Sequence, residues 1–434
     1  MRIDVVVGSQ YGDEGKGKVV NYLNEYFNYD YVFRVNASTN ASHCVTNNEN
    51  VYITKQLPSI FFKKDTKLIV SPGAILNLSK LKEEIFNRPD IEEIKDNIKI
   101  ASSIPLIIDP FIHKNKNCEY RKKIGSTNQG TGVAMVTRVT RCDIKLFDVE
   151  NAARDKSKIE NLEEKIRIAC NNLKIDVDEC SINKISIDLI NDFIEIEKKV
   201  GKFCYDYTQF LYDLIKKDKK QLQHILIEGC NGILLDNLHG VYPYTTSCST
   251  SISSLLNSAN LSPFDLSNIF VVMGAYTCCL NKRPFVTEMN SEDASKIYNN
   301  NPEVDYAEGM KRRVGWLDLV VLKKALLGHI SCNLFINKLD VLQDFEELKI
   351  CYAYKLKDGR IINILPDDIS LIDGAKPLYK TFKGFGKIKY SNNTPIKTKE
   401  INDYVNFILD ELNNDNISCD VYKLGFGPDS NNLI

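Results

Sequence analysis

A glycine-rich loop near the N-terminus carries residue types that bind phosphate. Residues 12–18 read GDEGKGK and come shortly after the strand-like run IDVVV at 3–7. The spacing GxxxxGK between a strand and a helix is that of a P-loop, in which backbone N–H groups and a lysine bind phosphate oxygens. The predicted phosphate loop consists of Gly12, Asp13, Glu14, Gly15, Lys16, Gly17 and Lys18.

Two acids, Asp13 and Glu14, lie inside this loop, where their charge would repel an anion. A P-loop normally has Ser or Thr after its lysine to bind magnesium, but Val19 follows Lys18 here. An acid beside phosphate makes sense when a cation lies between them, and Asp13 is the nearest hard oxygen donor. The sequence therefore predicts a Mg²⁺ site that includes Asp13. The alternative is a glycine-rich turn whose acids are simply solvated.

A second motif, Asn-Lys-Leu-Asp at 337–340, follows the apolar run NLF. In this pattern the carboxylate of Asp340 accepts hydrogen bonds from the ring N–H and the amine of guanine together. Adenine lacks that pair, and a site built for such a contact strongly rejects an analogue without it. With a phosphate loop on the first strand, the motif favours GTP over ATP.

These two motifs alone also permit a GTP-dependent switch without further chemistry. Against that alternative, Val19 replaces the hydroxyl residue that such switches use, and we find no clear DxxG segment to sense the γ-phosphate.

Short β-branched apolar runs alternate with longer mixed segments along the chain. Such continuous apolar runs are typical of strands buried on both faces of a parallel sheet. We therefore predict an α/β fold: a large, mostly parallel central sheet flanked by helices, with a P-loop-like first βα loop and small antiparallel additions. The expected strands include 3–7, 31–35, 67–71, 224–229, 268–276, 333–340 and 420–427.

Two segments depart from this alternation. Residues 151–223 carry apolar residues at helical spacing with charge on the other face, which predicts a helical insertion. Residues 347–365 alternate around Asp358-Gly359, which predicts an antiparallel hairpin. No internal repeat or long linker divides the chain, so we expect a single domain over 1–434.

Composition limits the classes of partner. The chain has 434 residues, 56 Lys and Arg against 57 Asp and Glu, and a net charge of −1. This balance gives no reason to expect nucleic acid or an anionic membrane as a partner. The 13 cysteines are scattered without CxxC pairs, so we expect reduced thiols in a cytoplasmic protein.

The motifs in their order resemble the adenylosuccinate synthetase family, which joins aspartate to IMP with GTP as cosubstrate. The resemblance covers nearly the whole chain. It lies in GSQYGDEGKGK at 8–18, NASTNASHCV at 36–45, IGSTNQGTG at 124–132, EGCNGILLD at 228–236, HGVYPYTTS at 239–247, KRRVGWLD at 311–318, NKLD at 337–340 and GFGPD at 425–429.

The resemblance implies a mechanism that uses the acid of the phosphate loop. Asp13 would remove the proton from the ring nitrogen beside the 6-oxo group of IMP, and that oxygen would then attack the γ-phosphate of GTP. His43 would donate a hydrogen bond to the transferring phosphoryl group. The amine of aspartate would displace the 6-phosphoryl group. Asp13 would also bind Mg²⁺, together with the backbone carbonyl of Ser42.

Further positions follow from the resemblance. The GTP contacts would be the phosphate loop together with Ser42, His43, Cys44, Arg313, Lys338, Leu339, Asp340, Gly425, Phe426 and Gly427. The nucleoside monophosphate contacts would be Asp13, Lys16, Asn40, Ala41, Thr127, Arg141, Asn231, Thr246 and Lys311. Arg141 would reach the partner subunit's site, which implies a homodimer. The loop that receives aspartate would be Ala307, Glu308, Gly309, Met310, Lys311, Arg312 and Arg313.

The chain also departs from the family. The usual Thr-Thr-Gly-Arg-Arg-Arg-Arg is Ala-Glu-Gly-Met-Lys-Arg-Arg at 307–313, and Glu308 adds a charge that would repel aspartate. Ser42 replaces a glycine, and Asn231 replaces a glutamine. Two alternatives stay open: the viral branch of the family, which acts on dGMP, and a paralogue that binds nucleotides without turnover. The retained Asp13 favours IMP, because the exocyclic amine of a guanylate would crowd it.

Overall fold

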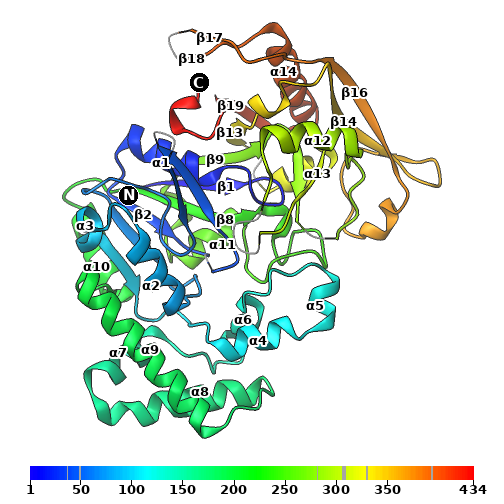
Figure 1. The fold of residues 1–434 in the computed structure, drawn as a ribbon. Coiled ribbons are helices and arrows are strands. Elements are labelled where there is room, and N and C mark those ends of the chain that lie inside the picture. The colour runs from blue at the N-terminus through cyan, green and yellow to red at the C-terminus, as the bar shows by residue number, and fades with distance from the viewer. Residues whose placement is uncertain (37, 48–49, 281, 305–308, 329–330, 392–393) are drawn as a thin grey trace.

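The computed structural model describes residues 1–434 except 37, 48–49, 281, 305–308, 329–330 and 392–393. Among the described residues, nine strands form one central sheet in the order β19-β13-β9-β1-β8-β2-β5-β6-β7 (Figure 1). All neighbouring strands in it run parallel, which confirms the predicted fold class. The strands are β1 (Arg2–Gly8), β2 (Tyr31–Arg34), β5 (Lys67–Val70), β6 (Ile98–Ala101), β7 (Cys204–Tyr205), β8 (His224–Gly232), β9 (Leu266–Gly274), β13 (Ser331–Asn337) and β19 (Ser418–Leu424).

The central strands are apolar on both faces because each face carries its own hydrophobic core. In β1, Val5 and Val7 belong to one core cluster, whereas Val6 between them belongs to the other. Alternate residues of a strand point to opposite faces, so the uninterrupted run in β1 serves both cores. This is why the strands lack the apolar–polar alternation of a one-sided sheet.

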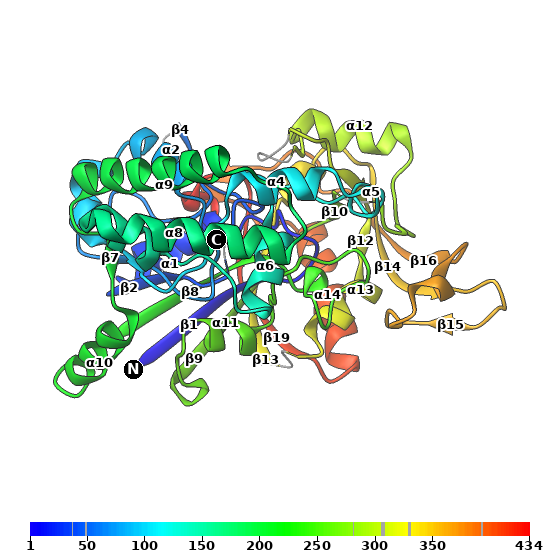
Figure 2. The same ribbon diagram turned by 90° about the horizontal axis from the view of Figure 1, so that it is seen from below.

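The predicted helical insertion contains mostly helices. In order they are α8 (Ile159–Asn172), α9 (Glu179–Val200) and α10 (Tyr207–Asp218), and they follow α7 (Leu146–Arg154). Figure 2 shows α8 and α9 running side by side, and α9 also contacts α2 (Leu78–Asn87). Between α9 and α10, the short β7 pairs with β6 and returns the chain to the sheet edge. The single-domain organisation stays a prediction.

The antiparallel additions lie outside the central sheet. β14 (Glu347–Lys355) pairs antiparallel with β15 (Ile361–Ile362), as the Asp358-Gly359 turn predicts, and with the longer β16 (Lys376–Lys383). Gly359 has a φ of +88°, a conformation that glycine adopts without strain. A hairpin of β3 (His43–Asn47) and β4 (Asn50–Thr54) was not predicted.

Several loops that carry motifs leave the sheet on one side, at the carboxyl ends of its strands. β1 leads into the phosphate loop and then α1 (Lys16–Phe27), and β13 leads into the Asn-Lys-Leu-Asp motif. Because carboxyl ends of parallel strands meet at one edge, these loops converge there. A small helical group, made of α4 (Asp109–Lys116), α5 (Glu119–Lys123) and α6 (Thr131–Val139), gathers beside this edge in both views (Figures 1 and 2).

In the described part of the chain, no helix combines the length and the apolar character that a membrane span requires.

Candidate active site

A cavity of about 970 Å³ opens at this edge of the sheet. It runs from the phosphate loop and the β13 motif to the α4–α6 group. Eighteen of the predicted site residues line it: Gly12, Asp13, Gly15, Lys16, Gly17, Lys18, Asn40, Ala41, Ser42, His43, Cys44, Thr127, Asn231, Thr246, Arg312, Lys338, Asp340 and Gly427. Among the described residues, the predicted positions that do not line it are Glu14, Arg141, Gly309, Met310, Lys311, Arg313, Leu339, Gly425 and Phe426.

Glu14 stabilises the phosphate loop from within. Its Oε1 accepts hydrogen bonds from the backbone N–H groups of Gln10 (3.0 Å) and Gly12 (2.9 Å). Its Oε2 forms an ion pair with Lys16 Nζ at 2.6 Å, and both side chains are buried. The charge of Glu14 is therefore compensated inside the loop.

The β13 motif also supports the phosphate loop. Asn337 donates its side-chain N–H to the backbone carbonyl of Glu14 at 2.8 Å. Lys18, which is buried at the start of α1, donates to the carbonyl of Gly427 at 2.7 Å. Burial lowers the pKa of Lys18 to about 8, although the charge of Asp340 opposes this shift. The two motifs thus form one bonded unit.

Asp13 lies in the left-handed region with a φ of 63° and keeps a half-buried carboxylate in the cavity. Its Oδ2 lies 3.1 Å from Lys338 Nζ and 3.5 Å from Arg312 Nε. Burial alone would raise the pKa of Asp13, but the charges of Lys338 and Arg312 outweigh it and hold this pKa below its ordinary range. Asp13 is therefore ionised at neutral pH.

A buried acid, Glu303, completes this cluster, which we call the acidic end of the cavity: Asp13, Glu303 and Lys338. Glu303 Oε1 lies 2.6 Å from Lys338 Nζ and also accepts from the Tyr276 hydroxyl. Burial raises the pKa of Glu303 to about 7, and the charge of Asp13 acts in the same direction.

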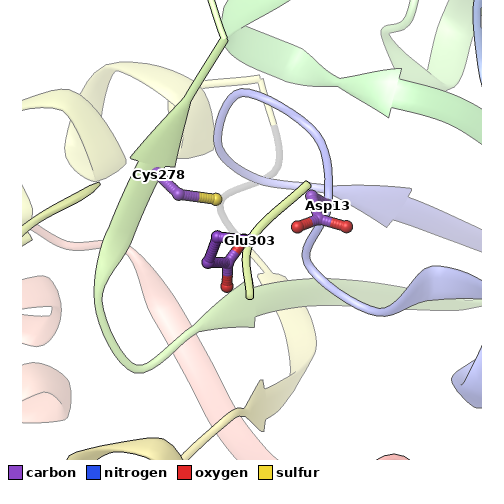
Figure 3. A group of neighbouring side chains, drawn as sticks. All are labelled: Asp13, Cys278 and Glu303. Atoms are coloured by element: carbon purple, nitrogen blue, oxygen red, sulfur yellow. The ribbon is translucent and has the colours of Figure 1, made fainter. Parts of the chain in front are cut away.

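One feature of the acidic end resembles a metal centre. Ligand atoms of Asp13, Cys278 and Glu303 lie within 4.8 Å of one another, and Figure 3 shows the three side chains side by side. However, Lys338 Nζ already bonds to both carboxylates. Its ammonium group supplies the positive charge that a metal between the two acids would supply.

His43 lies against a buried ion pair between adjacent strands. Arg34 of β2 and Glu228 of β8 are register partners and bond to each other with neither side chain exposed. The Nδ1 of His43 lies 2.6 Å from Arg34 Nη1 and 2.5 Å from Glu228 Oε1, and Glu228 also accepts from the backbone N–H of Ser59 at 2.8 Å. Burial and the Arg34 charge lower the pKa of His43 to about 3. The imidazole is therefore neutral at physiological pH.

The predicted monophosphate contacts lie toward the α4–α6 group. Asn40 donates to the hydroxyl of Thr246 at 3.4 Å, and Thr127 lies in the loop before α6. Asn231 has a φ of 62°, and its buried Nδ2 has no partner among the described residues. Arg141 follows α6, is exposed and lies outside the cavity of its own chain.

The predicted aspartate loop is only partly described. Ala307 and Glu308 lie outside the described residues, and Gly309 and Met310 are exposed. Lys311 lies over the ring of Tyr298, with its Nζ 3.5 Å from the ring centroid.

The two arginines that end this loop take different positions. Arg312 lines the cavity near Asp13, as described above. Arg313 forms a two-pronged ion pair with Glu288 at 2.7 and 2.5 Å and donates to the backbone carbonyl of Arg283 at 2.8 Å. The structure thus brings Arg312, and not Arg313, to the acidic end.

Asp340 presents an acceptor to the cavity. Its Oδ1 is buried and has no hydrogen-bond partner among the described residues. Burial raises the pKa of Asp340, although the charge of Lys18 opposes the shift. A buried carboxylate oxygen without a partner is costly, which is consistent with a donor that arrives with a ligand.

Sequence reasoning missed three charged residues of the site. Arg34 and Glu228 each interrupt an apolar strand run, and opposite charges in two buried strands indicate that they pair. Such a pair of opposite charges is a signal by which the sequence alone can indicate the contact. Glu303 lies in no motif that we recognised, and only the tertiary structure brings it to Asp13.

Together, the parallel sheet, the phosphate loop after β1 and the Asn-Lys-Leu-Asp segment after β13 define a nucleotide-binding α/β enzyme. Comparison with known proteins then gives its family. The sequence model of the adenylosuccinate synthetase family matches residues 5–434. The chain therefore belongs to the adenylosuccinate synthetase family.

Relatives and solved structures agree with this assignment. The chain is 33% identical to the adenylosuccinate synthetase of Thermodesulfovibrio yellowstonii, covering 94% of each chain. It is also 33% identical to that of Aquifex aeolicus, covering 93% of this chain and 91% of the relative. A solved structure of fully ligated adenylosuccinate synthetase from Plasmodium falciparum has the same fold, with a TM-score of 0.84, 23% identity and coverage of 100% and 99%. Succinoaminodeoxyadenylate synthetase of cyanophage S-2L, bound to dGMP and dATP, is less similar, with a TM-score of 0.61, 15% identity and coverage of 100% and 95%.

Proposed function

We propose that this chain joins L-aspartate to the 6-position of IMP, with GTP as cosubstrate, to give adenylosuccinate, GDP and phosphate. Membership of the family makes the chain a ligase that forms a C–N bond. What supports the particular reaction is that one cavity is lined by the phosphate loop, Asp13, His43 and Asp340.

In this proposal Asp13 is the general base. Its ionised carboxylate takes the proton from the ring nitrogen beside the 6-oxo group, and the negative charge moves to that oxygen. The oxygen then forms a bond to the γ-phosphorus of GTP, and the bond from that phosphorus to the GDP oxygen breaks. The amine of aspartate attacks carbon 6 and displaces inorganic phosphate.

Neutral His43 supplies a hydrogen bond and no charge. When Arg34 donates to Nδ1 of His43, the ring proton lies on Nε2, from which it can be donated to a phosphoryl oxygen. Such a preorganised donor stabilises charge that develops in the transition state. Glu228 contacts both Arg34 and Nδ1 of His43, and the two strands thereby hold the orientation of the imidazole.

The residues present fit a Mg²⁺ ion beside the phosphates. Both cations that contact Asp13 approach Oδ2, and hard oxygen donors such as Oδ1 and the carbonyl of Ser42 are the ligands that Mg²⁺ prefers. Ser42 lines the same cavity. Asp13 and Ser42 would hold the ion, and the remaining ligands would come from phosphate oxygens and water. When bound, the ion would neutralise charge on the triphosphate.

Guanine, aspartate and the partner subunit's monophosphate would each have a further contact in this chain. Asp340 would accept from the ring N–H and amine of guanine, and Arg312 would bind a carboxylate of aspartate. Arg141, which is exposed and outside its own cavity, would reach the partner subunit's site in a homodimer. The cytoplasmic location stays a prediction.

The test measures product formation from each of IMP, dIMP, GMP and dGMP in the presence of GTP, aspartate and Mg²⁺. Absorbance and chromatographic separation of the nucleotides detect the product. We expect aspartate-dependent product and GDP from IMP. Product from dGMP instead would transfer the assignment to the reaction of the viral branch. GTP hydrolysis without aspartate dependence, or nucleotide binding without turnover, would contradict the ligase.

A labelled substrate tests the intermediate. IMP that carries ¹⁸O at the 6-position should pass its label to the released phosphate, because that oxygen leaves carbon 6 with the phosphoryl group. Label that stays on the purine or appears in water would contradict phosphorylation of that oxygen.

A further inference from the structure

The α4–α6 side of the cavity carries an arginine that no motif predicted. Arg121 of α5 lines the cavity with Asn115, Thr127 and Ser247, and we call these four residues the arginine end. The family motifs that carry the resemblance include neither Arg121 nor Asn115.

Arg121 differs in its partners from Lys16, Lys338 and Arg312 of the same cavity. Lys16 pairs with Glu14, whereas Lys338 and Arg312 pair with Asp13. Arg121 forms no ion pair with any residue that the structure describes, and its bonded partner there is the neutral amide oxygen of Asn115. It therefore brings an uncompensated positive charge to the cavity wall.

The guanidinium is held in a fixed place by its surroundings. Asn115 is buried and donates its own N–H to Asn128 Oδ1 at 3.0 Å, which orients the amide oxygen toward Arg121. A β-carbon at Gly132 would lie 3.0 Å from Arg121 Nη1 and 2.7 Å from Ser247 Oγ. The guanidinium and the hydroxyl thus lie together against a glycine in the first turn of α6, where a side chain would displace them.

This end lies next to the predicted monophosphate contacts. Ser247 follows Thr246, which bonds to Asn40, and Thr127 is itself one of the predicted contacts. A planar guanidinium with several N–H donors matches a phosphate monoester. The N–H groups of the first turn of α6 add a favourable field for an anion.

We propose that Arg121 binds the 5′-phosphate of the nucleoside monophosphate from within the same subunit, and so selects monophosphates over nucleosides. The inference rests on the proposed function, which places a monophosphate in this cavity. In one chain, Arg141 is exposed and outside the cavity, so Arg121 gives each subunit a phosphate ligand of its own.

The experiment compares the affinities of the full-length protein for IMP and for inosine by titration calorimetry. Arg121→Met should weaken IMP binding about 10- to 100-fold, the usual effect of losing hydrogen bonds to a charged group. Its affinity for inosine, which lacks the phosphate, should not change. Arg121→Lys should restore part of the loss. Lys123→Met, which removes an exposed positive charge from the same helix, is the matched control and should bind like the wild type.

A second variant tests the position of the guanidinium without removing it. Gly132→Ala should also weaken IMP more than inosine, because the new β-carbon displaces Arg121 and Ser247. Unchanged IMP affinity in Arg121→Met, or equal loss of IMP and inosine, would overturn the inference.

The same panel separates this inference from the proposed function. If the wild type turns over IMP and Arg121→Met keeps its KM for IMP, only the role of Arg121 fails. If the wild type binds no purine monophosphate, both proposals fail.

Discussion

The two ends of the cavity treat charge in opposite ways. At the acidic end, Lys338 Nζ lies 3.1 Å from Asp13 Oδ2 and 2.6 Å from Glu303 Oε1, so that each carboxylate has a positive partner. At the arginine end, the side chains around Arg121 are neutral. Chemistry at the first end needs a carboxylate held in one position, and its partners are therefore built in. Binding at the second end needs a site for an anion that is bound and released, and Arg121 accordingly has no acidic partner among the described residues.

This difference also explains why the ends respond differently to change. Removing one member of a buried, bonded charge network leaves its partner uncompensated, which is costly for folding. Removing Arg121 leaves only a neutral partner, the amide oxygen of Asn115, and no uncompensated charge. We therefore expect variants at the acidic end to affect turnover and stability, and variants at the arginine end to affect binding alone.

The largest expected effect is on turnover at the acidic end. Asp13→Asn keeps the shape of the side chain but removes the base, so kcat should fall about 1,000-fold or more. GTP affinity should change little by comparison. Single-turnover kinetics and GTP titration measure the two quantities, and a kcat within tenfold of the wild type would contradict the role of Asp13.

The next effect is on stability. Lys338→Met removes the cation between Asp13 and Glu303 and leaves the two acids without it, so the free energy of unfolding should fall by about 2 kcal/mol. Glu83→Gln, in an exposed pair with Lys80, is the control and should cost less than about 0.5 kcal/mol. Urea denaturation compares the variants. Equal stability of Lys338→Met and Glu83→Gln would remove the distinction between a bonded network and an ordinary surface pair.

A variant of Asp340 should impair the recognition of guanine without affecting the acidic end or the arginine end. Asp340 has a buried acceptor without a described partner. Asp340→Asn should therefore raise the KM for GTP about 10- to 100-fold, because a charged acceptor of two hydrogen bonds is lost. The KM for IMP should stay within about twofold, since the proposed contacts of guanine and of the monophosphate lie in separate parts of the cavity. Steady-state kinetics with each substrate varied in turn measures this, and equal rises in both constants would count against a guanine contact.

An effect of similar size is expected in the pH dependence of stability. His43 has a folded-state pKa of about 3, whereas an unfolded histidine titrates near 6.5. Between these values the unfolded chain binds the extra proton, so stability falls as pH falls. From pH 6.5 to pH 5 the loss from this residue should be about 2 kcal/mol. His43→Asn should lose that part of the slope in urea denaturation across the same range. An identical slope in the variant would show that His43 is not held neutral by Arg34.

Much of the fold could be predicted because its signals are local. Continuous apolar runs mark buried parallel strands, and Asp358-Gly359 marks a hairpin whatever surrounds it. The β3–β4 hairpin was missed because both strands are short and β4 is mostly exposed, so that its apolar signal is weak. The β3 strand contacts α1, so the place of the hairpin in the fold depends on this tertiary contact and not on the local pattern of apolar residues.

The site divides in the same way. Asp13 and Asp340 could be predicted because each lies in a motif with a fixed backbone conformation around it. Glu303 and Arg121 could not, because their importance comes from neighbours far away in sequence: Lys338 for one, Gly132 and Ser247 for the other. For Lys338 the resemblance predicts a GTP contact, and in the structure its ammonium group bonds to Asp13 and Glu303. Tertiary placement decides such roles.

The most direct test is a structure of the protein with IMP and a non-hydrolysable GTP analogue bound together. We expect the carboxylate of Asp13 within hydrogen-bonding distance of the purine ring nitrogen beside the 6-oxo group, and the 5′-phosphate against Arg121. A complex in which the purine lies away from Asp13, or in which the phosphate lies at the acidic end, would contradict the account.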